Sequence, residues 1–155
     1  MKIRKATLND LEIIAHYNAL LARETEDKVL DLQELTKGVK ALLEDTNKGI
    51  YYVCELEGQV IGQIMYTYEW SDWRNGLYLW VQSVYVHATY RKQGIFKALY
   101  NHVKEICDRD NDTVGIRLYV EKENNVAQNT YQNLGMEECN YLMYAYEKTN
   151  RETHE

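Results

Sequence analysis

The apolar residues of this chain recur with two periods, one typical of helices and one typical of strands. Apolar residues return every three or four positions in residues 11–21, 31–45 and 94–108, which predicts three amphipathic helices. A shorter stretch, 125–134, has the same period and ends at Gly135, a residue that often terminates helices. The run Thr7-Leu8-Asn9-Asp10 is a helix-start signal and predicts where the first helix begins.

Six further stretches alternate in the manner of β-strands, and turn residues separate several of them. They are residues 1–5, 50–56, 60–69, 77–87, 114–120 and 136–146. Glu57-Gly58 predicts a hairpin between the second and the third. The resulting order, β-α-α-β-β-β-α-β-α-β, predicts one α+β domain, a mixed central sheet flanked by about four helices. We expect this domain to cover residues 1–146 and a polar tail to cover 147–155.

The composition narrows the function classes. Of the 155 residues, 45% are hydrophobic, which suffices for a substantial core, and the formal net charge is −6. The negative charge argues against a nucleic-acid partner and suits a cationic small molecule. No apolar run resembles a signal peptide or a membrane span, so we expect a cytoplasmic protein without a membrane partner. The three cysteines are far apart and the histidines are scattered, which predicts reduced, mostly buried thiols and no metal site.

Positive charge gathers where the fourth strand passes into the third helix. The amides of Gln93, Gly94, Ile95 and Phe96 would form the first helical turn there. A helix N-terminus carries unpaired N–H groups and a partial positive charge, and a glycine lets a phosphate approach the backbone closely. The neighbouring cations, Arg91, Lys92 and Lys97, add to this field. The turn therefore predicts a pyrophosphate site; the alternative is an ordinary glycine turn beside solvated cations.

Two motifs carry a family resemblance. The run Val84-x-Val86-x-x-x-x-Arg91-x-x-Gly94-x-Phe96 resembles the acetyl-CoA motif of the GNAT N-acetyltransferase superfamily. Farther along, Asn124-x-x-Ala127-x-x-x-Tyr131-x-x-x-Gly135-Met136 is similar to the second motif of that superfamily. The resemblance spans about residues 1–146. Phe96 departs from it, because the family usually has glycine or alanine at that position.

The resemblance implies a GNAT fold and direct transfer of an acetyl group from acetyl-CoA, the co-substrate, to a primary amine in a ternary complex. The Val84 N–H would bind the thioester carbonyl, and Val86 would hold the pantetheine arm. Tyr131 would donate to the coenzyme A sulfur; without the motif it would read as a half-buried core tyrosine. The cofactor-binding residues implied are Val84, Val86, Arg91, Lys92, Gln93, Gly94, Ile95, Phe96, Lys97, Asn124, Ala127 and Tyr131.

Two acidic segments are candidates for amine binding. Glu24 and Glu26 follow the first predicted helix, where relatives build a substrate loop, or else form a solvated helix end. Glu69 and Asp72 flank tryptophans such as Trp73, a combination that attracts cations, or else form an exposed turn. The acidic loop and the many tyrosines resemble small-amine acetyltransferases. That type carries strand carboxylates where this chain has Gln82 and Ser83, so the candidates for a general base, acting through a water, are Glu24, Glu26, Glu69 and Asp72.

Two other functions remain open at this point. The first is a regulatory module that binds acyl-CoA without catalysis, and the second is an acetyltransferase of protein N-termini or lysines. The aromatic final segment, Cys139 to Tyr146, is also compatible with a homodimer.

Overall fold

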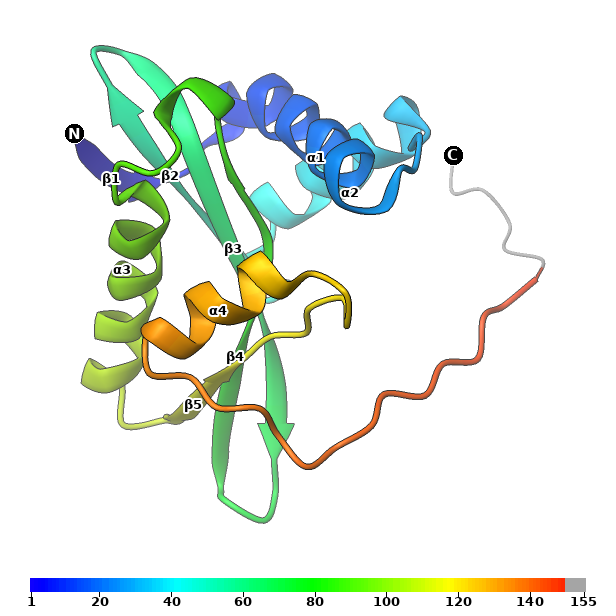
Figure 1. The fold of residues 1–155 in the computed structure, drawn as a ribbon, viewed down its shortest axis with the longest axis vertical. Coiled ribbons are helices and arrows are strands. Elements are labelled where there is room, and N and C mark those ends of the chain that lie inside the picture. Colours follow the sequence, from blue (N-terminus) through cyan, green and yellow to red (C-terminus); the bar gives the residue numbers. More distant parts are fainter. Residues whose placement is uncertain (150–155) are drawn as a thin grey trace. The chain divides into compact units, whose positions relative to one another are not determined.

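The computed structural model describes residues 1–149 and divides the chain into two compact units (Figure 1). The first unit comprises Met1–Glu121, and the second begins at Lys122. The predicted α+β class is confirmed: residues 1–149 contain one mixed five-stranded sheet and four α-helices. In the first unit the elements are β1 (Lys2–Lys5), the 3₁₀ turn η1 (Leu8–Asp10), α1 (Leu11–Glu26), α2 (Leu32–Leu43), β2 (Ile50–Leu56), β3 (Gln59–Ser71), β4 (Gly76–Val86), η2 (Ala88–Tyr90), α3 (Ile95–Arg109) and β5 (Thr113–Arg117).

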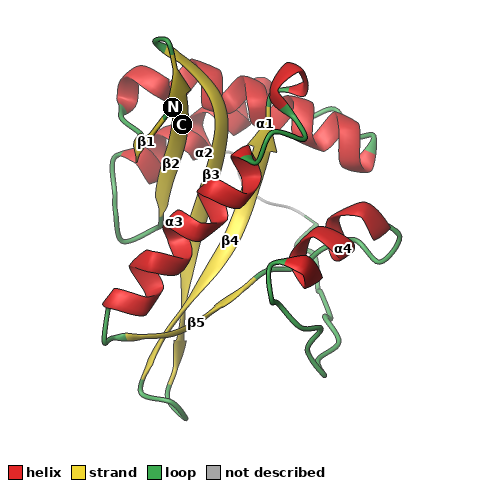
Figure 2. Ribbon diagram, turned by 60° about the vertical axis from the view of Figure 1, so that its left-hand side comes forward, coloured by secondary structure: helices red, strands yellow, loops and turns green. Residues whose placement is uncertain are grey.

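The strands follow one another across the sheet in the order β1-β2-β3-β4-β5. Each neighbouring pair from β1 to β4 is antiparallel, whereas β4 and β5 run parallel. The parallel pair requires a crossover, and α3 supplies it (Figure 2). The sheet is therefore mixed, as predicted.

The helices of the first unit cover both faces of this sheet, because successive strand residues point to opposite sides. Ile64 and Tyr66 of β3 pack with Leu99 and Val103 of α3. Met65, between them in the sequence, packs on the other face in a cluster with residues of α1 and α2. Both cores contain residues of β2 and β3, which point to opposite faces of the sheet.

The start of α1 agrees with the prediction, and its end does not. The Thr7 side chain accepts from the Asn9 amide at 3.3 Å, and Asp10 accepts from the Thr7 amide at 2.8 Å, which completes the capping box. The helix then continues to Glu26, through the acidic segment that we expected to follow it. Glu24 and Glu26 consequently lie in the last turn of a helix. Both are good helix formers, and the chain leaves the helix only at Asp27, whose φ of 51° is left-handed.

The apolar spacing of residues 94–108 predicts an inward face made of Phe96, Leu99, Tyr100, Val103 and Ile106, and helix α3 buries a slightly different one. Ile95, Leu99, Tyr100 and Val103 are buried, whereas Phe96 is half-buried with its ring 6.4 Å from that of Tyr100. The interior therefore takes Ile95 where the sequence pattern indicated Phe96.

The second unit contains α4 (Asn125–Asn133) followed by a segment without regular structure. Asn124 caps the helix by accepting from the Ala127 amide at 3.1 Å. Gly135, with φ of 92°, ends it as predicted, and the Met136 amide donates to the Tyr131 carbonyl at 3.1 Å.

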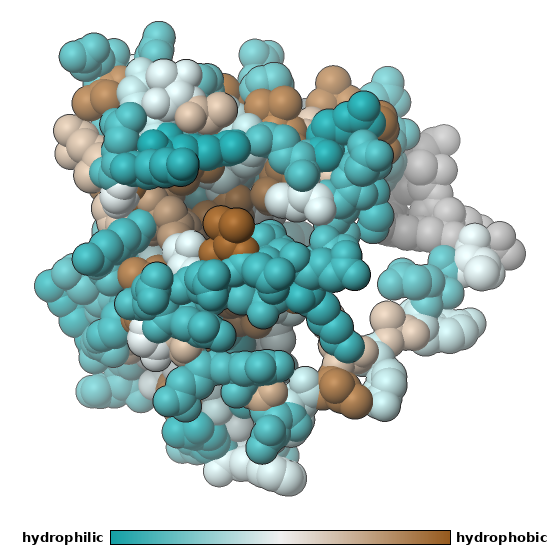
Figure 3. Space-filling model, viewed as in Figure 1, coloured by the Kyte–Doolittle hydropathy of each residue, from teal (hydrophilic) through white to brown (hydrophobic). Residues whose placement is uncertain are grey.

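The predicted strand 136–146 is wrong: residues 136–146 form no strand. Alternation supplies only a preference, since a strand also needs a neighbour to satisfy its backbone groups. The apolar side chains of this segment are exposed, Leu142 by 73% and Tyr144 by 89% (Figure 3). Of the predicted tail 147–155, residues 150–155 lie outside the described part of the chain.

The thiols follow the burial prediction only in part. Cys54 is buried, Cys107 is half-buried and Cys139 is exposed, and no disulfide joins them. Among residues 1–149 no helix is long and apolar enough to cross a membrane. In the same residues no three His, Cys, Asp or Glu side chains are grouped in a way that could hold a metal ion.

Candidate active site

Strand β4 continues beyond the point where β5 leaves it. The parallel pairing runs from Leu77 with Thr113 to Trp80 with Arg117 and then stops, whereas β4 extends to Val86. From Val81 onward, β3 is the only strand in the described chain that pairs with β4. The sheet therefore opens along one edge of β4, as the family resemblance implies for this strand.

The backbone of Val86 faces that open edge. The His87 amide donates to the Ile61 carbonyl of β3 at 2.8 Å. Because successive residues of an antiparallel strand direct their backbone N–H and C=O groups to alternate sides, those of Val86 point away from β3. Val84, two positions earlier, has the same orientation. The Val86 carbonyl is in fact used outside the sheet, because it accepts from Arg91 Nε at 2.9 Å.

A β-bulge in β4 includes Val84. Gln63 pairs with Tyr85 and Met65 with Gln82, so one residue of β3 stands opposite two residues of β4, Ser83 and Val84. Ser83 has a φ of 52°, in the left-handed region. The extra residue bends β4 at the point where β5 has separated, and it turns the backbone beyond it toward the gap.

A buried polar network supports the bulge from the α1 face. The Gln63 side-chain amide, fully buried, donates to the Ser83 carbonyl at 3.0 Å and to Asn18 Oδ1 at 2.9 Å. Asn18, from α1, donates in turn to the Tyr51 hydroxyl at 2.9 Å. Three elements therefore hold the bulge through hydrogen bonds. Gln63 Oε1 is buried and has no protein partner.

The turn before α3 contains two residues in the left-handed region. Lys92 and Gly94 have φ values of 64° and 82°, and Gly94 opens the helix with no side chain capping it. A Cβ atom added at Gly94 would meet no atom within 4 Å, so the space beside this residue is open. Gln93, Gly94 and Lys97 are exposed, and Ile95 is anchored in the core.

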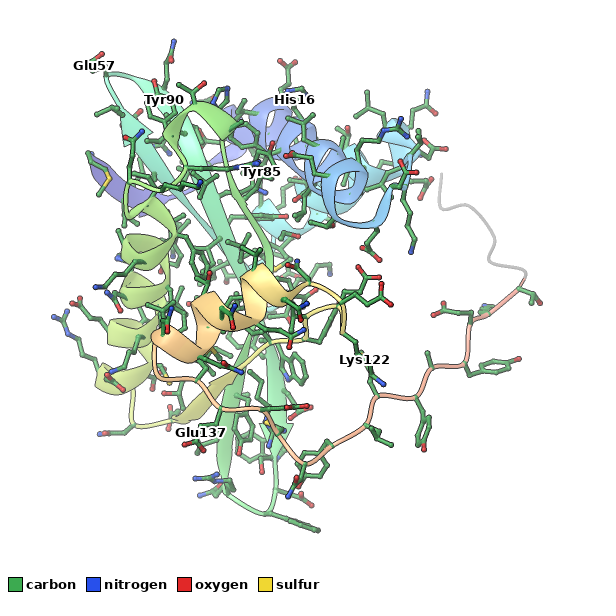
Figure 4. The ribbon with its side chains drawn as sticks, viewed as in Figure 1. His16, Glu57, Tyr85, Tyr90, Lys122 and Glu137 are labelled. Carbon is green, nitrogen blue, oxygen red and sulfur yellow. The ribbon has the colours of Figure 1, made fainter. Side chains whose placement is uncertain are left out.

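The Arg91 side chain extends from this turn and contacts Glu24 in the last turn of α1. Its Nη2 lies 2.9 Å from Glu24 Oε1, and its guanidinium carbon lies 5.2 Å from the centre of the Tyr85 ring. The Tyr85 hydroxyl donates to the other oxygen, Glu24 Oε2. Tyr85 thus points from β4 toward α1, where its ring also lies 5.1 Å from that of Tyr17 (Figure 4).

These contacts fix the protonation of the cluster. Burial and the Glu24 carboxylate raise the pKa of Tyr85 to about 12, so its hydroxyl keeps its proton at neutral pH. For Glu24, partial burial opposes ionisation, yet the hydrogen bonds from Tyr85 and Arg91 outweigh it and lower the pKa. Glu24 is therefore an ionised carboxylate suited to binding a cation, not a strong base.

The structure separates the two acidic segments. Glu69 lies on β3 and pairs with Arg117 at 2.8 Å, while Asp72 and Trp73 belong to the turn between β3 and β4. Trp73 is 93% exposed. This turn is at the opposite end of β4 from Val84, roughly 25 Å away at about 3.3 Å per residue. Of the acidic residues named, Glu24 alone contacts the turn before α3, through Arg91; Glu26 pairs with Lys28 at 3.4 Å.

Three predicted residues belong to the second unit. The Asn124 side chain caps α4 by accepting a hydrogen bond from the Ala127 amide, so the spacing of these two motif residues has a local structural role. Tyr131 is half-buried, and burial raises the pKa of its phenol. A phenol of raised pKa stays protonated near neutral pH, as a proton donor must.

Sequence reasoning missed the three residues that connect the site to the body of the protein. Tyr85 lies inside the first motif, and its place on the α1 face follows from strand alternation. Asn18 and Gln63 gave a weaker signal, a polar residue at an otherwise apolar position of a helix or strand.

Comparison with known proteins agrees with this geometry. The model of the acetyltransferase (GNAT) family matches residues 14–136, most of the chain. The protein therefore belongs to the GNAT acetyltransferase family, whose characteristic reaction is acetyl transfer. None of the curated proteins matches the chain.

Solved structures show the same fold. A possible acetyltransferase from Clostridium difficile 630 is 58% identical with a TM-score of 0.92, over 96% of this chain and 98% of that one. A transcriptional regulator from Bacillus halodurans C-125 is 21% identical, with a TM-score of 0.79 over 94% and 98%. A ribosomal-protein-alanine N-acetyltransferase from Brucella melitensis biovar Abortus 2308 is 16% identical, with a TM-score of 0.76 over 95% and 98%. The last two likenesses show the fold alone.

Proposed function

We propose that the protein transfers an acetyl group from acetyl-CoA to a primary amine of a small molecule, by direct attack in a ternary complex. The observation that carries the proposal is the open edge of β4 beyond Trp80, which lies in the same unit as the uncapped first turn of α3. The edge offers backbone groups to a thioester and its pantetheine arm, and the helix turn offers amides to a pyrophosphate.

The residues at this edge fit acetyl-CoA. Gly94 leaves open space before the helix, and Lys92 and Lys97 add positive charge beside it. Val84 and Val86 turn their backbone groups to the open side of β4, where the N–H of Val84 can stabilise the negative charge that develops on the carbonyl oxygen. Acetyl-CoA supplies the activated acyl group.

The acceptor reacts only as a neutral amine, since an alkylammonium ion has no lone pair. Its ordinary pKa is about 10.4 for a lysine-like amine, so a proton must leave before attack. We propose that the acceptor enters between the end of α1 and the open edge of β4, where Glu24 attracts it as a cation. Tyr131 is the proposed donor to the departing coenzyme A sulfur, by the family motif that it matches.

Two alternatives remain in competition with this proposal. A non-catalytic acyl-CoA-binding module shares the cofactor site, and one fold relative is a transcriptional regulator. A protein or peptide N-acetyltransferase shares the chemistry, and another fold relative is a ribosomal-protein-alanine N-acetyltransferase. The carboxylate of Glu24 at the site suits a cationic amine acceptor. A homodimer through residues 139–146 also remains a proposal, supported by the exposure of the apolar side chains there.

The test is release of the free thiol of coenzyme A from acetyl-CoA in the presence of polyamines, lysine analogues, aminoglycosides and short peptides. We expect turnover with one class of small amine, and we expect Tyr131→Phe to lower kcat about 10²-fold or more, the usual range for loss of a general acid. Turnover of peptides alone would support the protein acetyltransferase. If no amine reacts while acetyl-CoA still raises the Tm, the binding module is the better description.

A further inference from the structure

Two of the three guanidinium nitrogens of Arg91 are already engaged within the protein. Nη2 contacts Glu24 Oε1 at 2.9 Å, and Nε donates to the Val86 carbonyl at 2.9 Å. Tyr85 completes the cluster, because its hydroxyl binds the second oxygen of Glu24 and its ring lies under the guanidinium. The residue expected to meet the pyrophosphate is thus held by a carboxylate from α1, 67 positions earlier in the chain.

A phosphate and a carboxylate make the same demand on an arginine. Each presents oxygens to the planar N–H donors of the guanidinium, and both cannot occupy the same donors. The Glu24 and Arg91 side chains retain 38% and 43% of their exposure, so an incoming anion can reach the pair. A half-exposed ion pair of this kind is also weak enough to open.

We propose that Glu24 competes with the pyrophosphate of acetyl-CoA for Arg91, so that the cofactor must open this autoinhibitory contact to bind. The inference rests on the proposed function for the identity of its ligand. After opening, Arg91 faces the phosphates, and Glu24 keeps the hydrogen bond of Tyr85 while its other oxygen becomes available to a cation. Because linkage is reciprocal, a cationic acceptor that binds Glu24 in turn strengthens the binding of acetyl-CoA. The two substrates are coupled through one carboxylate.

The experiment is calorimetric titration of coenzyme A into the whole protein and into Glu24→Gln. Removal of the competitor should lower the Kd of coenzyme A by roughly two- to fivefold, the range for a half-exposed ion pair. S-acetyl-pantetheine, which lacks the pyrophosphate, should bind both proteins equally. Asp27→Asn is the matched control: it removes the same charge three residues farther on, from a carboxylate that pairs with Arg23 at 3.2 Å and not with Arg91. It should leave the Kd unchanged.

A double-mutant cycle separates this contact from a general effect of charge. In the Arg91→Gln background, Glu24→Gln should no longer change the Kd. If the gain persists there, or if Glu24→Gln alone leaves the Kd unchanged or raises it, the competition does not exist even though the cofactor site stands. If coenzyme A does not bind the unmodified protein at all, the proposed function fails and this inference fails with it.

Discussion

Gln63 is the residue on which the shape of the β4 bulge most depends. Its buried amide holds the Ser83 carbonyl and Asn18, and a methionine of similar size could replace neither hydrogen bond. We expect Gln63→Met to lower the free energy of unfolding by about 1–3 kcal/mol, because two buried acceptors lose their donor. It should also lower kcat more than the Tm alone explains, since Val84 is one of the two residues of the bulge.

Urea denaturation and steady-state kinetics measure the two effects. Gln59→Met, on the exposed start of the same strand, is the control and should change neither quantity. An unfolding free energy equal to that of the unmodified protein would show that the network does not hold the bulge.

Asp10 makes stability depend on acid pH. Its carboxylate receives two hydrogen bonds from Arg4, at 2.8 and 2.9 Å, which together with the Thr7 amide lower its pKa from the ordinary value of 3.8 despite burial. A carboxyl group whose pKa is lower in the folded state stabilises fully above the unfolded pKa. The contribution disappears as the pH falls below 3.8 and through the folded value.

We therefore expect Asp10→Asn to cost about 1–3 kcal/mol at pH 7, because the Arg4 guanidinium loses the nearer of its two carboxylate partners, Asp10 and Glu55. The cost should shrink as the pH is lowered from 5 toward 2, in urea titrations of both proteins. A cost that is the same at every pH would assign the effect of Asp10 to its shape and not to its charge.

At the scale of elements, Gly62 allows α3 to approach the sheet. A Cβ at this position of β3 would lie 3.1 Å from Ile95 Cγ2 and 3.4 Å from Leu99 Cδ1. We expect Gly62→Ala to cost about 1–3 kcal/mol through overpacking. Because Ile95 begins α3, displacement of this residue should also raise the Kd of coenzyme A.

Gly38→Ala is the matched control, since nothing lies within 4 Å of a Cβ at that exposed position in α2. It should raise stability by about 1 kcal/mol, the difference in helix propensity between the two residues. If Gly62→Ala were equally harmless, the contact of α3 with β3 would be looser than the distances indicate.

The elements also show what a sequence can predict. Thr7 and Asp10, and likewise Gly135, mark helix ends by local hydrogen bonds and backbone geometry, and those ends were predicted correctly. The end of α1 was not predicted correctly, because the helix continues through polar residues beyond the last apolar position. The strand predicted for residues 136–146 was wrong, because a strand also needs a neighbouring strand. Motif spacing likewise identified the turn of Arg91 and Gly94, while the contact of Arg91 with Glu24 arises only when distant elements meet.

At the scale of the whole molecule, the two acidic segments lie too far apart for one small amine. Glu24 contacts Arg91 in the turn before α3, and Asp72 lies at the opposite end of the β3–β4 hairpin. At saturating acetyl-CoA, Glu24→Gln should raise the KM for the amine by roughly three- to tenfold, as expected for loss of a hydrogen bond to a charged group. Asp72→Asn should leave it unchanged, and the reverse result would move the acceptor site to the hairpin.

The location of the acetyl-CoA site is tested most directly by NMR of the ¹⁵N-labelled protein titrated with coenzyme A. We expect the largest amide shifts at Val84, at Val86 and in the first turn of α3, Gly94 to Lys97. The chemical shifts of amides in the β3–β4 turn, such as that of Trp73, should not change. Shifts concentrated at that turn, or none at saturating ligand, would contradict the assignment of the β4 edge and the α3 N-terminus as the cofactor site.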